Sequence, residues 1–198
     1  RMPRARGKAR AGGIVDAVSI AERPPEVDDR RVPGHWEGDL IKGAFNRSAV
    51  GVLLERTSRY VLLAKMDGCT AEDALASFTR RLGTINPAVR KTLTYDRGTE
   101  MALHEELAER LNIDIYFCDP HSPWQRASNE NINGLIRQFL PKGMDLSTVT
   151  HQQLAYIEMA LNTRPRAMHK FRTPLEVFSE ILEAQHASNQ SPGVALRH

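Results

Sequence analysis

The chain has little of what builds disulfide-bonded, zinc-binding or membrane proteins. It has two cysteines, Cys69 and Cys118, far apart and without a CxxC pair. This excludes a disulfide framework and a four-cysteine zinc site, and it favours a reducing cytoplasm as the location. Cys118 and His121 have a ligand-like spacing, but no second pair completes a zinc site. No apolar run approaches the roughly 18–20 residues that span a bilayer, and no secretory signal follows the Arg-rich start. We therefore expect a cytoplasmic protein without a membrane segment.

Several common catalytic motifs are also missing. No P-loop, GxGxxG run or Ser-His-Asp order is present. The composition is that of a soluble globular protein, with 41% hydrophobic and 26% charged residues. A length of 198 residues is enough for one domain with a hydrophobic core. The net charge of +3 is a modest lean toward anionic partners.

The start of the chain concentrates positive charge. Five basic residues and no acid occur among the first ten: Arg1, Arg4, Arg6, Lys8 and Arg10. This stretch is either a solvated tail or an arm that lies along a phosphate backbone and releases counterions. Charge alone does not choose between the two.

The pattern along the chain predicts one folded core with two looser ends. Residues 1–33 read as a basic, Pro-containing lead-in or linker, 34–184 as the core, and 185–198 as a loose polar tail. Strands are predicted at 36–41, 48–54, 60–65, 92–95 and 113–117. Helices follow the third, fourth and fifth strands, and the first of these has Thr70 as its N-cap, with Asp73 three residues on, and ends at Gly83. Two more lie near 151–162 and after a capping box at Thr173 and Glu176. This order predicts an α/β fold with a mixed five-stranded sheet flanked by helices, as in the ribonuclease-H-like fold.

Asp39 lies in a strand that is otherwise apolar and aromatic. Aspartate is disfavoured in strands, and an ionised carboxylate is costly to bury without partners. Gly38 beside it removes side-chain bulk, as the close approach of a ligand would require. The alternative is a strand whose face carrying Glu37 and Asp39 is exposed to solvent.

Asp96 follows the predicted strand at 92–95. The carboxyl ends of strands in α/β folds are usual positions for binding and catalytic groups. An Asp in a strand-to-helix turn that bonds its own backbone is the common structural explanation.

Glu130 opens a helix whose apolar stripe faces inward, comprising Ile132, Leu135, Ile136, Phe139 and Leu140. At about 100° per residue, Glu130 points nearly opposite that stripe, together with Gly134 and Arg137. A solvated first-turn glutamate is the simpler interpretation. Three poor helix formers in the same turn, Asn129, Asn131 and Asn133, favour a phosphate-binding surface instead.

Together the three acids predict a metal centre on three separate elements. Oxygen ligands suit hard cations such as Mg²⁺ or Mn²⁺. Two such ions, about 3.5–4 Å apart, clamp the attacking and leaving oxygens of a phosphoryl displacement. We therefore expect Asp39, Asp96 and Glu130 to be both the catalytic residues and the metal ligands.

Several long motifs closely resemble the insertion-sequence-thirty group of DDE transposases. They are GHWEGDLI at 34–41, RKTLTYDRGTEM at 90–101, YFCDPHSPWQR at 116–126, NENINGLIRQFLPKG at 129–143 and LNTRPR at 161–166. The resemblance covers about 32–178, and its spacing also agrees, since 33 residues (97 to 129) separate Asp96 from Glu130.

This resemblance implies an integrase-like ribonuclease-H fold and a metal-dependent reaction on DNA. Hydrolysis would free a 3′-hydroxyl at the transposon end, which then attacks target DNA without a covalent enzyme intermediate. The implied partners are the element's terminal inverted repeats, target DNA and further copies of the chain in a multimeric complex.

The sequence departs from the family pattern in places. Family members carry an N-terminal helix-turn-helix that recognises the element's ends, so we expect this chain, with Arg1 before Met2, to be a fragment. Ala127-Ser128 stands where Gly-Thr is expected, and 168–171 also differs. The three acids are intact.

Two alternatives to a transposase core stay open, and several residues are candidates for DNA contact. The alternatives are a DNA-binding remnant or regulator, which has no need of three acids, and a simple metal-dependent nuclease. Expected DNA contacts are Arg97, Trp124, Gln125, Arg126, Asn129, Asn133 and Arg137. Trp124 is equally compatible with core packing. Arg164 and Arg166 either hold phosphates or cap the preceding helix.

Overall fold

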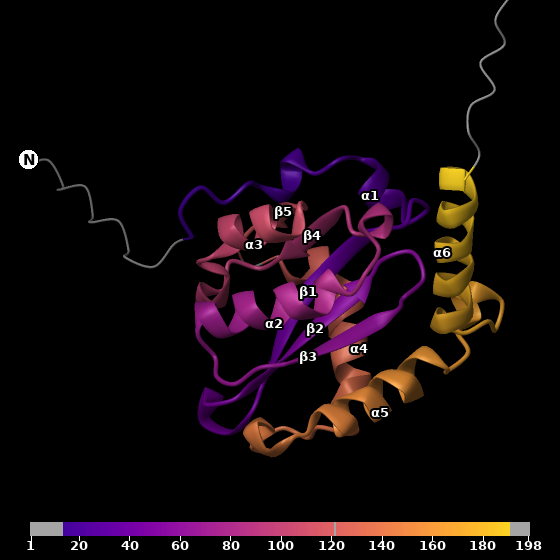
Figure 1. Cartoon of the computed structure of the whole chain (residues 1–198). Coiled ribbons are helices and arrows are strands. Elements are labelled where there is room, and N and C mark those ends of the chain that lie inside the picture. Colours follow the sequence, from indigo (N-terminus) through magenta and orange to yellow (C-terminus); the bar gives the residue numbers. More distant parts are fainter. Residues whose placement is uncertain (1–13, 121, 191–198) are drawn as a thin grey trace, which may run out of the picture.

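A mixed five-stranded sheet forms the centre of the computed structural model, which describes residues 14–120 and 122–190 (Figure 1). Its strands are β1 (His35–Lys42), β2 (Ala49–Glu55), β3 (Val61–Lys65), β4 (Thr92–Tyr95) and β5 (Asp114–Phe117). They lie in the order β3-β2-β1-β4-β5. The pairs β1–β2 and β2–β3 are antiparallel, whereas β1–β4 and β4–β5 are parallel. The predicted mixed sheet is therefore confirmed.

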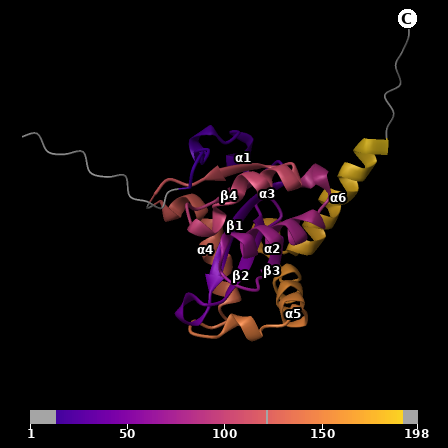
Figure 2. The same cartoon turned by 60° about the vertical axis from the view of Figure 1, so that its left-hand side comes forward.

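Helices cover both faces of this sheet. They are α1 (Glu26–Asp29), α2 (Ala71–Gly83), α3 (His104–Leu111), α4 (Ala127–Ile136), α5 (His151–Asn162) and α6 (Pro174–Gln190). Short 3₁₀ turns occur at Ile20–Glu22, Ala44–Asn46, Pro87–Val89, Thr99–Met101, Pro123–Arg126, Leu146–Thr148 and Ala167–His169. Figures 1 and 2 show α2 and α3 on one side of the sheet and α4 on the other. Within the described ranges, no helix is long and apolar enough to cross a membrane.

The two-sided cover explains why β2 is buried along its whole length and apolar up to its last residue, Glu55. Val50, Val52 and Leu54 pack into the cluster formed with α4 and α5, whereas Ala49 and Leu53 pack with α2. Successive side chains of a strand point to opposite faces, so both sets are buried. Each buried Val or Leu contributes about 1.5–3 kcal/mol relative to an exposed one. This buried strand is the rigid neighbour of β1.

The predicted helix starts are confirmed by reciprocal capping bonds. Asp73 N–H donates to Thr70 Oγ1, and Thr70 N–H donates to the Asp73 carboxylate. Thr173 and Glu176 form the same arrangement at the start of α6. Each box satisfies two amide donors that have no partner within the helix.

The lead-in differs from its predicted irregular, loosely packed state. Val27 of α1 is buried, and its carbonyl accepts from Arg56 Nε at 3.1 Å. Phe117 N–H donates to Val18 O at 2.8 Å, so this segment runs beside β5. Residues 14–33 are therefore part of the folded body, and the predicted boundary at 34 is too late. The predicted basic arm at 1–10 lies outside the described residues.

Two helix ends also differ from the prediction. The predicted inward stripe continues to Leu140, but α4 ends at Ile136, and Phe139 is 38% exposed against Tyr156. The amides of Gln138 and Phe139 bond carbonyls three residues back, which tightens the turn and rotates Phe139 outward. Helix α6 continues to Gln190, past the predicted boundary at 184. The remainder of the predicted tail, 191–198, lies outside the described residues.

Candidate active site

Strand β1 presents its acids toward α4. Trp36 and Leu40 pack in the α2 cluster, whereas Ile41 packs in the cluster that contains α4. Since side chains alternate along a strand, Glu37 and Asp39 share the side of Ile41. Gly38 faces the other way, where an added Cβ would lie 2.5 Å from the Tyr95 ring. The glycine therefore makes room for Tyr95, and the interpretation that it admits a ligand is corrected.

Neither Glu37 nor Asp39 of β1 lies on a solvent-exposed face of the sheet. Glu37 is fully buried and forms an ion pair with Arg56. The Asp39 side chain is 22% exposed, and its Oδ2 accepts from Asn133 Nδ2 at 2.7 Å. Its Oδ1 accepts from the Leu40 amide of the same strand at 2.9 Å. The other partners of Asp39 come from α4 and the turn before it, so this carboxylate joins the sheet to that helix.

The two carboxylate oxygens of Asp96 have different partners. Its Oδ1 accepts from the Gly98 amide at 3.1 Å, which is the local turn bond. Its Oδ2 accepts from Arg126 Nη2 at 2.9 Å, and the side chain is 39% exposed. One oxygen therefore fixes the turn and the other points toward the site.

Arg126 bridges the two aspartates. Its Nη1 lies 3.2 Å from Asp39 Oδ1, while Nη2 bonds Asp96. Burial is the largest influence on the pKa of Arg126 and lowers it, but Asp39 and Asp96 outweigh it, so the pKa is raised. Two carboxylates that converge on one guanidinium are able to share a cation. Their oxygen donors fit Mg²⁺ or Mn²⁺.

Glu130 is not gathered into this cluster. It lies on α4, one turn after Arg126 and in the same turn as Asn133, and is exposed. Its carboxylate has no hydrogen bond or ion pair with the residues that the structure describes. Within 14–120 and 122–190, no three His, Cys, Asp or Glu side chains are grouped as a metal site. The structure thus joins two of the three predicted ligands and leaves the third on the adjacent helix.

A cavity of about 400 Å³ opens beside Asp96 and Arg126. Cys118 lines it, and burial raises the pKa of this thiol to about 11. The thiol is therefore protonated at neutral pH and is a poor metal ligand. His121, the other member of the considered zinc pair, lies outside the described residues.

The predicted DNA contacts fall into two classes. Trp124 is 71% exposed, which excludes the alternative of core packing, and Arg97 is also exposed, with Nε bonded to Cys118 O at 3.3 Å. Gln125 instead clamps its own loop, because it accepts from Asp119 N–H and donates to the Asp119 carboxylate. Arg137 donates to Lys42 O at the end of β1.

The asparagines of α4 have a structural task that the sequence did not reveal. Asn129 is 1% exposed and donates to Gly38 O at 3.2 Å. Asn133 does the same for Asp39, so the two amides, one turn apart, fasten α4 along β1. Because Asn129 is buried, we leave it out of the DNA contacts proposed below. Arg166 Nη2 donates to Leu161 O, so one nitrogen of this side chain caps the end of α5.

Comparisons with known proteins identify the family of this chain. Residues 29–123 match the integrase core domain family, a range that includes Asp39 and Asp96 and ends before Glu130. The chain is 57% identical over 182 residues to the transposase for insertion sequence element IS1086 of Cupriavidus metallidurans, which covers 92% of this chain and 54% of that relative. It is 43% identical over 164 residues to transposase InsI for insertion sequence element IS30A of Escherichia coli, covering 83% and 43%. The chain belongs to the IS30 group of transposases. It spans about half the length of these curated relatives.

The fold of this IS30-group chain is the ribonuclease-H-like fold of integrases, as predicted. A chain of the simian T-cell lymphotropic virus intasome, solved in complex with a PP2A regulatory subunit, superposes with a TM-score of 0.58. The match covers 82% of this chain and 56% of the viral one at 17% identity. That likeness concerns the fold alone, and the five-stranded order agrees with it.

Proposed function

We propose that this chain is the catalytic core of a DNA transposase, a polynucleotidyl transferase that cuts and joins phosphodiesters. The observation that carries the proposal is the convergence of Asp39 and Asp96 on one cation, the Arg126 guanidinium. Partly exposed carboxylates that share a positive charge beside an open cavity suit a metal-assisted phosphoryl reaction.

The proposed cofactor is a pair of Mg²⁺ or Mn²⁺ ions. Asp39 and Asp96 would hold them, with Glu130 as the third carboxylate from the adjacent helix. When bound, the ions supply the activation of water or a 3′-hydroxyl and the stabilisation of the departing oxygen. Arg126 competes for the same oxygens, so it must release at least one of them.

The remaining residues of the site have separate roles in this proposal. Asn133 holds the Asp39 carboxylate in place through its 2.7 Å bond. Arg126, once released, is a bidentate donor suited to a DNA phosphate. Trp124 offers an exposed ring on which a base can stack, and Arg97 and Arg137 add charge at the cavity and at the end of β1.

The proposed substrates are the terminal inverted repeats of the parent element and a target DNA. We also propose that the chain works as a homo-oligomer in that complex, so that two ends are processed together. Gln125 contributes by holding the loop at 119–125 rather than by touching DNA.

The test is strand cleavage and joining on oligonucleotides from the element's end with Mg²⁺ or Mn²⁺. Wild type is compared with Glu130→Gln. In wild type the Glu130 carboxylate is exposed and makes no hydrogen bond or ion pair with the described residues. The pair is assayed as this chain and as the whole product of its gene, because the chain spans about half the length of its relatives. Joined products that disappear in Glu130→Gln support the proposal.

Two other outcomes would replace it. Cutting without joining in the full-length protein indicates a metal-dependent nuclease. DNA binding without chemistry in both proteins indicates a DNA-binding regulator that keeps the fold.

A further inference from the structure

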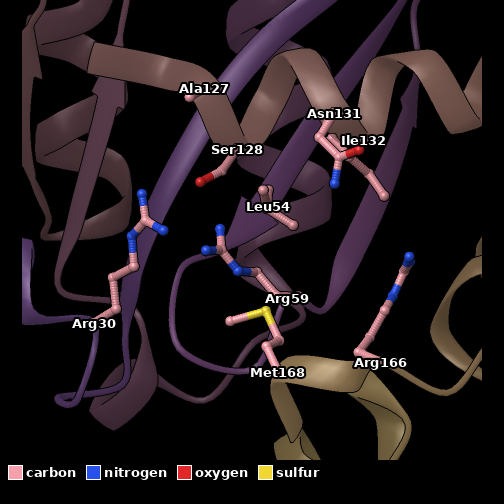
Figure 3. Close-up of a pocket in the computed structure, with 9 residues that line it drawn as sticks. All are labelled: Arg30, Leu54, Arg59, Ala127, Ser128, Asn131, Ile132, Arg166 and Met168. Atoms are coloured by element: carbon pink, nitrogen blue, oxygen red, sulfur yellow. The ribbon is translucent and has the colours of Figure 1, made fainter. Parts of the chain in front are cut away.

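A second cavity, of about 230 Å³, lies against a different side of α4 and has apolar side chains, among them Leu54, Ile132 and Met168, in its lining (Figure 3). Arg30, Arg59 and Arg166 line it together with Ser128 and Asn131 of the helix. At about 100° per residue, Ser128 and Asn131 point away from the side that Arg126 presents to the aspartates. The cavity is therefore distinct from the acid site, although both use α4 as a wall.

The three arginines reach this cavity from segments that are far apart in the sequence. Arg30 ends α1, Arg59 lies in the turn between β2 and β3, and Arg166 follows α5. Figure 3 shows their side chains extending toward the part of α4 that carries Ser128 and Asn131. The tertiary fold, rather than a local basic run, creates this concentration of charge.

No acid lines the cavity, and none of the three arginines forms an ion pair within the described residues. Burial lowers the pKa of Arg59, and nearby Arg30 lowers it further. Glu37 and Glu55 act in the opposite direction on Arg59, but both are engaged elsewhere. Glu37 pairs with Arg56, and Glu55 accepts from Ser58.

Arg166 carries a further sign of an absent partner. Its Nη2 donates to Leu161 O, but its Nε is buried without a hydrogen-bond partner among the described residues. Burial lowers the pKa of Arg166, followed by the charge of Arg164. A buried donor without a partner is unfavourable, and a bound anion would satisfy it and offset the three like charges.

We propose that this cavity binds a phosphate of a DNA strand, away from the phosphodiester that is cut. Guanidinium groups match phosphate oxygens with two parallel donors, and hydroxyl and amide side chains add neutral donors. A helix is on the order of 10 Å across, so a strand that passes α4 can reach both the cavity and the acid site. The inference rests on the proposed action on DNA.

The test is DNA binding by the Arg30→Gln/Arg59→Gln double variant. Fluorescence anisotropy with a labelled duplex is measured over a series of salt concentrations without divalent metal. We expect affinity to fall on the order of tenfold at fixed salt. The slope of log K against log salt should become shallower by about 0.9 for one lost phosphate contact.

Arg110→Gln is the matched control, since Arg110 is exposed on α3, across the sheet from the cavity, and pairs with Glu106. It removes one charge and should change affinity by less than about twofold. Arg59→Gln alone also removes one charge, so it is compared directly with Arg110→Gln. Arg59→Lys keeps the charge and should retain most of the slope of log K against log salt. Thermal unfolding is recorded for every variant, and Arg59→Gln replaces the double variant if the latter does not fold.

Three results would overturn the proposal. One is an affinity loss in the cavity variants no larger than in Arg110→Gln. Another is stabilisation of wild type by inorganic phosphate, absent in the double variant, with unchanged DNA affinity, which indicates a free phosphate ligand. The last is a changed oligomeric state with unchanged DNA affinity, which indicates an acidic segment of a second copy. Failure of strand joining with intact DNA binding would count against the proposed function and leave the cavity assignment standing.

Discussion

The two sides of α4 carry opposite arrangements of charge. On one side, the Arg126 guanidinium is shared between the carboxylates of Asp39 and Asp96. On the other, Arg30, Arg59 and Arg166 meet without an acid in the cavity lining. The first cluster already holds a cation, so it binds a metal by exchanging one cation for another. The second cluster holds three cations and no acid, so it favours an anion from outside the fold.

The same contrast occurs within one turn between β2 and β3. Arg56 is buried and paired with buried Glu37, whereas Arg59, three residues later, has no ion pair with the described residues. Because of this difference, the two arginines should respond very differently to substitution.

Arg56→Met should give the largest effect on stability. It leaves Glu37 buried without its counter-ion, which costs about 3–5 kcal/mol in the free energy of unfolding. Urea unfolding monitored by circular dichroism measures this cost. The double variant Glu37→Met/Arg56→Met should recover most of it, because the orphaned charge is gone. A loss below about 1 kcal/mol in Arg56→Met would show that the pair is not a structural element.

An intermediate effect is expected from the asparagines of α4. Asn129→Ala removes the buried donor to Gly38 O and should cost about 1–3 kcal/mol. Asn131→Ala, on the exposed side of the same helix, should stay within about 0.5 kcal/mol. Equal losses in the two variants would mean that helix propensity, not the bond to β1, determines the outcome.

The smallest effect is expected at Arg59. Arg59→Gln should change the free energy of unfolding by no more than about 0.5 kcal/mol, because no described ion pair is lost and like-charge repulsion from Arg30 is relieved. Thermal and urea unfolding of Arg59→Gln and Arg56→Met, measured side by side, compare the two free energies of unfolding. A cost similar to that of Arg56→Met would identify Arg59 as a structural residue and remove the contrast.

Most of the fold follows from sequence patterns because they reflect local physics. The strand at 92–95 and the helix beginning at Ala71 have the predicted bounds or nearly so, since strand alternation and capping chemistry act over a few residues. The prediction that Gly38 makes room for a ligand is wrong, because the ring that needs the space, Tyr95, lies on another strand. The tight turn after Ile136 also depends on tertiary packing, so the apolar pattern did not reveal that Phe139 faces outward.

The site was predictable in part for the same reason. Asp39 and Asp96 stand out as acids at strand positions where a carboxylate is unusual, and the fold brings them together. Nothing local indicates that Arg126 lies between them or that Asn133 bonds Asp39. The arginine cavity was equally hidden, because its three residues are gathered only by the tertiary fold.

The central claim, that Asp39 and Asp96 form a metal site now held by Arg126, is tested most directly by Mn²⁺ binding. Electron paramagnetic resonance of free Mn²⁺ is followed while wild type, Arg126→Gln and Asp39→Asn/Arg126→Gln are titrated. The account predicts that Arg126→Gln binds Mn²⁺ about tenfold or more tightly than wild type, because the competing guanidinium is gone. It also predicts that adding Asp39→Asn abolishes the gain. Unchanged Mn²⁺ affinity in Arg126→Gln, or a gain that survives without Asp39, would contradict it.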